Sequence, residues 1–169
     1  MKQLKGLIEK ARHSAFWNWI LNQGLLRGIP FNHPHRLWVN KLTESDIEIS
    51  IPYRKSNLNH LKGLHACVLA TASEYATGLL LIQRLDPEKY RIIMQRMEMQ
   101  YLYQGKQDSV AKFSISEEWL QTEVLKPLET SESIIISADV NTYDRSGNQL
   151  TAGKVFWQVK NWKSVRTKL

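Results

Sequence analysis

Residues between positions 59 and 74 include groups that could hydrolyse an activated acyl compound. Glu74 could act as a general base toward water, or as a nucleophile, if it is partly removed from solvent. The side-chain amide of Asn59 could donate to a carbonyl oxygen or hold a water molecule. If a helix begins near Ala66, its first N–H groups have no intrahelical partners. They could then stabilise the negative charge that develops on an attacked carbonyl.

The same residues also have a structural interpretation. Asn59 could satisfy the backbone of a turn, and Glu74 could pair with a buried hydroxyl group or a basic side chain. Carboxylates with perturbed pKa values occur in structural networks as well as in active sites. Taken alone, the residue types therefore favour the structural interpretation.

A helix over residues 64–85 is the element that would position these groups. A turn at residues 59–63 precedes it, and Pro87 cannot continue it. One face carries bulky apolar residues at three- and four-residue steps: Leu64, Val68, Ala72, Tyr75, Leu79 and Ile82. Another face carries small or weakly polar residues and one carboxylate: Cys67, Ala70, Thr71, Glu74, Thr77 and Gly78. The near absence of charge predicts a helix buried almost all round, with Cys67 in the core.

The distance along this helix constrains any active site. Ala66 and Glu74 are eight residues apart, which corresponds to about 12 Å at the helical rise per residue. One carbonyl group cannot contact both, so a real site would take the amide from one subunit and Glu74 from another. Small residues would let a second helix or a ligand approach closely: Ala70, Thr71, Thr77 and Gly78. We therefore expect an obligate two-fold dimer with two sites.

The remaining pattern predicts an N-terminal helix and an antiparallel sheet. Residues 1–30 carry apolar side chains at helical spacing until Gly28 and Pro30 end the element. Period-two alternation predicts a hairpin over residues 37–53 and later strands at 91–103, 111–115, 134–140 and 155–159. Ser116 is a plausible N-cap for a short helix that Pro127 would stop. This order favours one α+β domain over residues 1–169, with the sheet wrapped around a single long central helix at 64–85.

Composition limits the compartment and the partners. A hydrophobic fraction of 43% with six tryptophans predicts a packed globular domain. We find no membrane-spanning run and no signal peptide, and the single cysteine favours the cytoplasm. The net charge of +7 suits an anionic partner, but no nucleic-acid-binding motif is present, so we expect neither nucleic-acid binding nor membrane insertion. His33 and His35 have no nearby Cys, Asp or Glu to complete a metal site, so no metal is expected.

Asn59, His65 and Glu74, with five residues between the first pair and eight between the second, resemble the signature of hotdog-fold acyl-CoA thioesterases of the phenylacetate-pathway type. The order of helices and strands is similar over nearly the whole chain. The segments IPFNHPH, PYRKSNLNHLKGLHACVLATASEYATGLLL and KYRIIM look like a less characterised branch of that superfamily, one often labelled a domain of unknown function.

The resemblance implies a hotdog homodimer or a dimer of dimers, that is, a homotetramer. It implies a coenzyme A thioester as substrate and no additional cofactor. The implied catalytic residues are Glu74 as base or nucleophile, Asn59 to position water or the carbonyl, Ala66 to supply the amide, and His65 to support the turn. The implied substrate-binding residues are Gly63, Thr77, Gly78 and Arg91. The sequence departs from the family in having Ala66 where glycine usually follows the histidine, and Glu rather than the commoner Asp at position 74.

We therefore expect an acyl-CoA thioesterase whose site lies at a dimer interface. The alternative is a non-catalytic module that binds acyl-CoA or an acyl-carrier protein in the same pocket, because one fold can host unrelated functions. A hotdog dehydratase is less favoured, since the histidine-plus-proline-glycine pattern of that group is missing. Replacing Glu74 separates the first two, because only a hydrolase has a rate to lose.

Overall fold

The structure, a computed structural model, describes residues 2–166, with side chains from residue 6 onward, so residue 1 of the predicted N-terminal helix lies outside it. The helices are α1 (Lys2–His13), α2 (Ala15–Gly28), α3 (Ala66–Arg84), α4 (Glu117–Trp119) and α5 (Lys126–Thr130). Short helical turns are η1 (Pro30–Asn32), η2 (Lys55–Asn57), η3 (Leu120–Leu125) and η4 (Trp162–Ser164). The strands are β1 (Trp38–Leu42), β2 (Asp46–Ile51), β3 (Tyr90–Tyr101), β4 (Ser109–Ser114), β5 (Ser133–Asp144) and β6 (Gln149–Asn161).

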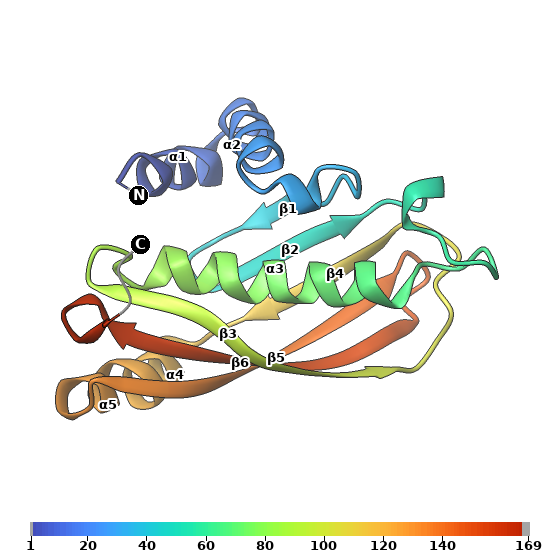
Figure 1. The fold of residues 1–169 in the computed structure, drawn as a ribbon. Helices are drawn as coiled ribbons and strands as arrows, with labels where there is room; N and C mark the ends of the chain where they lie inside the picture. Colours follow the sequence, from blue (N-terminus) through green and yellow to red (C-terminus); the bar gives the residue numbers. More distant parts are fainter. Residues whose placement is uncertain (1, 167–169) are drawn as a thin grey trace.

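All the strands form one antiparallel sheet in the order β1-β2-β4-β5-β6-β3, so β1 and β3 are its two edges. The sheet curves around α3, and the chain crosses from β2 on one side, through α3, to β3 at the far edge (Figure 1). The predicted α+β architecture, an antiparallel sheet wrapped around one long helix, is confirmed.

The β1–β2 hairpin illustrates how alternation in the sequence becomes a buried face. Val39 lies opposite Ile49 in the register, and the turn is closed by the Thr43 N–H donating to the Asp46 carbonyl (2.8 Å). Ile47, Ile49 and Ile51 are fully buried. Each buried isoleucine contributes about 1.5–3 kcal/mol to folding.

The helix α3 occupies almost the predicted residues, and its bulky stripe faces the sheet. Val68, Ala72, Tyr75 and Leu79 are all buried. Within residues 2–166, α3 is also the one helix that is long and apolar enough to cross a membrane, but most of it is buried inside the domain. Its apolar composition is thus explained by its place in the core.

The N-terminal segment forms two helices, where the sequence predicted one. The chain breaks at Ser14, whose backbone is extended (φ −149°, ψ 124°). The break turns the chain so that Ile8 of α1 and Leu21 and Leu25 of α2 are all buried, an arrangement that one straight helix of this length would not allow. Tertiary packing therefore overrides a helical periodicity that continues through Ser14.

The expected stop at Pro127 is also wrong. The Ser116 hydroxyl caps the segment by accepting from the Trp119 N–H (3.0 Å), as predicted. The helix then widens to a π turn over η3, and Pro127 lies in the first turn of α5. Proline is tolerated there because its missing N–H needs no partner at the start of a new helical segment.

Candidate active site

The turn at residues 59–63 is organised by Asn59. Its Oδ1 accepts from the Leu61 N–H (2.9 Å) and the Gly63 N–H (3.0 Å). Its backbone N–H donates to the Gly63 carbonyl (2.8 Å), and Lys62 adopts a left-handed conformation (φ 57°) that closes the turn. Asn59 therefore has the structural role that its sequence position allowed. Its Nδ2 donates to no protein group in residues 2–166 and remains available to a ligand.

At the start of α3 one backbone amide is left without a partner. His65 is the N-cap, and its Nδ1 accepts from the Cys67 N–H (3.1 Å). The His65 carbonyl accepts from the N–H groups of Val68 (3.0 Å) and Leu69 (3.3 Å). Among residues 2–166 nothing accepts from the Ala66 N–H, which lies at the positive end of the helix. This amide is the donor predicted for a carbonyl oxygen.

A cavity of about 300 Å³ opens beside this amide. It is lined by Asn59, Leu64, Ala66, Leu69, Tyr101, Leu102, Tyr103, Gln104 and Gly105. The Tyr101 hydroxyl, at the end of β3, donates to the Ala66 carbonyl (3.2 Å). Burial, followed by the nearby Cys67 thiol, raises the Tyr101 pKa, which keeps the phenol protonated as a donor. The sequence placed Tyr101 in a strand, but no sequence signal pointed to its contact with α3.

Two other predicted substrate-binding residues lie outside this cavity. Gly63 is buried behind the turn, where a Cβ atom would come within 2.8 Å of the Gln104 side chain. Arg91 lies at the opposite end of β3 from Tyr101, about 33 Å away at the rise of an extended strand. Its Nη2 contacts the Gln158 Oε1 (3.4 Å), and its Nε is buried without a hydrogen-bond partner within residues 2–166. Within one chain the structure does not bring Arg91 to the Ala66 amide.

The side of α3 that the sheet leaves uncovered forms an open stripe, defined here as Ala66, Cys67, Ala70, Thr71 and Glu74. These residues are exposed or half-buried, whereas the rest of the helix middle is buried. Cys67 was expected in the core but is exposed, because the curved sheet does not reach this side. The single chain therefore has a row of small side chains facing outward along α3.

Glu74 lies at the far end of the open stripe. Its carboxylate has no ion pair or hydrogen bond within residues 2–166, and burial raises its pKa above the ordinary value. It does not line the Ala66 cavity, as expected from its separation of about 12 Å along the helix axis. A half-buried carboxylate without a partner is costly unless something else approaches it.

Thr77 and Gly78 continue the side of α3 that carries the open stripe, beyond Glu74, but both are buried. The Thr77 hydroxyl accepts from the Trp157 Nε1–H (3.1 Å), and a Cβ atom on Gly78 would lie 2.8 Å from the Trp157 ring. Within the described chain neither residue is open to a second helix or a ligand, and their predicted part in substrate binding stays a prediction. Both are buried packing residues, because Trp157 of β6 fills the space that their small size leaves.

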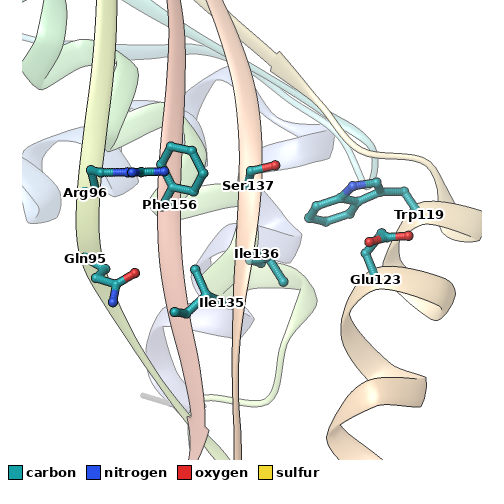
Figure 2. A pocket seen from close by; sticks show the side chains of 8 residues that line it. All are labelled: Gln95, Arg96, Trp119, Glu123, Ile135, Ile136, Ser137 and Phe156. Atoms are coloured by element: carbon teal, nitrogen blue, oxygen red, sulfur yellow. The ribbon is translucent and has the colours of Figure 1, made fainter.

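A larger cavity, of about 650 Å³, lies elsewhere, on the outer face of the sheet. Figure 2 shows Arg96 and Phe156 on the strands across from Trp119 and Glu123 on the helical segment. The Arg96 guanidinium lies 4.0 Å from the Phe156 ring centre. The Trp119 N–H is already bonded to Ser116, so this cavity lacks the free helix-start amide of the α3 site. Cavity size alone therefore does not identify the candidate site.

The described residues contain no cluster of three or more His, Cys, Asp or Glu that could hold a metal ion. Of the two loop histidines, His35 makes a local side-chain contact. His35 Nδ1 lies 3.0 Å from the Asn57 Oδ1, and His33 is exposed.

Solved structures with thioesterase names share this fold. A Pseudomonas aeruginosa protein of unknown function, named a probable thioesterase, superposes with a TM-score of 0.76 at 18% identity over 83% of this chain and 94% of that chain. A Haemophilus influenzae thioesterase gives 0.68 at 12% identity over 87% and 92%. A Staphylococcus aureus thioesterase variant gives 0.64 at 14% identity over 78% and 98%. At these identities the likeness establishes the fold and confirms the predicted hotdog architecture.

No curated protein matches the sequence. One family does, and it is described as a domain of unknown function, DUF4442, over residues 18–162. This agrees with the poorly characterised branch that the sequence motifs resembled. Because the match spans most of the chain, the protein belongs to the DUF4442 family and has a hotdog, thioesterase-like fold.

Proposed function

We propose that the protein hydrolyses a thioester, with acyl-CoA as the expected class, at a site completed across a two-fold dimer. The observation that carries the proposal is the Ala66 N–H, which is unpartnered among residues 2–166 at the start of α3 and lines a cavity. Such an amide is suited to a carbonyl oxygen that gains negative charge. The matching carboxylate, Glu74, is unpaired within the same residues on the same open stripe.

The symmetry of the open stripe supports a site shared between subunits. Ala66 and Glu74 each lie four residues from Ala70. A two-fold axis passing near Ala70 would run two α3 helices antiparallel and bring Glu74 of the partner subunit beside Ala66. The small side chains between them permit the close approach, since Ala70 and Thr71 add little bulk. The same axis would use the stripe twice and create two identical sites.

The free edge of β3 supports the same arrangement. Its middle residues, 93–96, are exposed, including Ile93 (46%) and Met94 (42%). Exposed apolar residues on a sheet edge favour pairing with another strand. Antiparallel pairing of two β3 strands near residue 96 would also bring Arg91 of the partner subunit close to Tyr101. That is where a phosphate of coenzyme A could meet it.

The reaction follows from these placements. The thioester carbonyl oxygen accepts from the Ala66 N–H, while Nδ2 of Asn59 holds the carbonyl or the attacking water. The Glu74 carboxylate of the partner subunit removes a proton from that water, and the new C–O bond forms a tetrahedral oxyanion. Collapse breaks the C–S bond, and the thiolate takes the proton from Glu74. The products are a carboxylic acid and a thiol, and Glu74 is again ionised. A raised Glu74 pKa makes the carboxylate a stronger base near neutral pH.

The test is thiol release from short, medium, long and aromatic acyl-CoAs, measured for the wild type and Glu74→Gln together. Loss of the general base should lower kcat by at least about a hundredfold, while substrate binding is largely kept. Glu123→Gln is the matched control, because it removes an exposed carboxylate in the outer cavity. Saturable binding without release from any substrate would favour the acyl-CoA or acyl-carrier-protein binding module. If no substrate is either hydrolysed or bound, the thioesterase and the binding-module hypotheses are both refuted.

A further inference from the structure

The outer face of α2 exposes aromatic side chains that the packing of the domain does not use. Phe16 is 63% exposed and Trp19 is 54% exposed. They are three residues apart and so share one face of the helix. Leu21 and Leu25 bury the opposite face. A helix that is apolar on both sides is normally buried on both, and α2 is covered on only one.

The two N-terminal helices also carry an excess of positive charge. Residues 2–28 contain five basic residues and one acidic residue: Lys2, Lys5, Lys10, Arg12 and Arg27 against Glu9. Arg12 is paired with Glu9 (3.1 Å) and Glu44 (3.3 Å). The Lys10 ammonium lies 4.5 Å from the Trp17 ring centre, next to Phe16. Arg27 is exposed toward the end of the same outer face of α2. Exposed aromatic groups and positive charge therefore occur together.

This surface is held in a fixed orientation. Asn22, which is buried, donates from Nδ2 to the Val39 carbonyl (3.0 Å) and accepts from the Val39 N–H (2.6 Å). These bonds tie the inner side of α2 to β1. Figure 1 shows α1 and α2 at the β1 side of the molecule, across the sheet from α4 and α5. The outer face of α2 thus points away from the core as part of the folded domain.

We propose that this α1–α2 surface docks the protein peripherally on anionic phospholipid. Phe16 and Trp19 enter the headgroup layer, where aromatic side chains are favoured, and the exposed Lys10 and Arg27 meet lipid phosphates. The charge argues for lipid rather than a second copy of the chain, because two such surfaces would repel each other. The docking is independent of thioester hydrolysis and inserts no helix across the bilayer. It would bring the protein to the phase in which long acyl chains concentrate.

The experiment is co-sedimentation of the full chain with vesicles of phosphatidylcholine alone or mixed with phosphatidylglycerol. We expect binding to the mixed vesicles only, and weakening at high salt because the charges are screened. The double variant Phe16→Ser with Trp19→Ser should bind at least about tenfold more weakly, since it removes the apolar groups that would be buried. Ile135→Ser, which removes an exposed apolar residue from β5 (54% exposed), is the matched control and should bind as the wild type does.

Several results would overturn the proposal. Absence of binding to both vesicle types is one, and equal binding by the wild type and the double variant is another. A change in assembly mass in the double variant, with vesicle binding unaltered, would assign the surface to contact between copies of the chain. Glu74→Gln should bind vesicles normally, so a failure of hydrolysis and a failure of docking can be told apart.

Discussion

Replacing Ala66 by proline removes the proposed oxyanion donor and almost nothing else. Ala66 is the first residue of α3, the position where proline is best tolerated in a helix because that N–H has no intrahelical partner. The preceding residue, His65, already has the extended backbone that proline requires before it (φ −69°, ψ 138°). The variant should therefore fold. Loss of one oxyanion-hole donor costs about 2.7–4 kcal/mol in the transition state, so kcat should fall about 10²–10³-fold. Ala66→Ser keeps the N–H and is the control.

A mixture of Ala66→Pro and Glu74→Gln subunits then tests whether the site is shared. Each homodimer lacks one essential group at both sites. In a mixed dimer, the intact Ala66 of one subunit faces the intact Glu74 of the other at one site, and both lesions fall at the second site. After unfolding and random reassembly at equal amounts, half of the dimers are mixed, so thiol release should return to about a quarter of the wild-type value. If the mixture stays as inactive as its components, Glu74 and Ala66 do not meet across subunits.

Three further outcomes are expected from the same geometry. Tyr101→Phe removes the hydroxyl that contacts the Ala66 carbonyl at 3.2 Å. Thermal unfolding should show that the free energy of unfolding falls by only about 0.5–1.5 kcal/mol. An unchanged rate of thiol release would mean that this hydroxyl does not help to hold the start of α3. Gly78→Ala places a methyl group 2.8 Å from the Trp157 ring, so denaturant unfolding should report a loss of about 1–3 kcal/mol, whereas wild-type stability would mean that the ring moves aside freely. Because burial raises the folded-state pKa of Glu74 above 4.5, the folded protein binds this proton more tightly than the unfolded chain does, and the charge destabilises folding increasingly as pH rises. Glu74→Gln should therefore unfold at higher denaturant concentration than the wild type at neutral pH, and this difference in stability should disappear below pH 4.5. If the variant is instead less stable than the wild type at neutral pH, the carboxylate has a favourable partner.

Local periodicity was enough to predict the elements that pack against each other. The spacing of Ile47, Ile49 and Ile51 predicted a strand with one buried face, and the structure buries all three. The apolar stripe of the central helix likewise predicted its span to within two residues at each end. These features depend on neighbours in the chain, which a sequence shows directly.

Features set by distant partners could not be predicted in this way. Thr77 and Gly78 share the small-residue face of Thr71, and only Trp157, eighty residues from Thr77, decides that this end of the face is covered. The contact of Tyr101 with Ala66 spans thirty-five residues. The exposure of Cys67 depends on how far the sheet curves around α3. In each case tertiary packing decides which side chains are covered, and the local sequence pattern does not show it.

The backbone groups at the two edges of the sheet differ in their hydrogen bonding, and this difference affects how many chains could join through strand pairing. At β1, Asn22 and Asn18 bond the backbone of Val39 where a neighbouring strand would otherwise pair. At β3, no strand pairs with the outer side within the described residues. A sheet open at both sides can add chains without limit, as fibrils do. With the Val39 backbone occupied by asparagine side chains, β3 is the edge of the described sheet that is better suited to pairing with another chain. If β3 pairs with β3 of a second chain, as proposed, the N-terminal helices would keep strand addition at two.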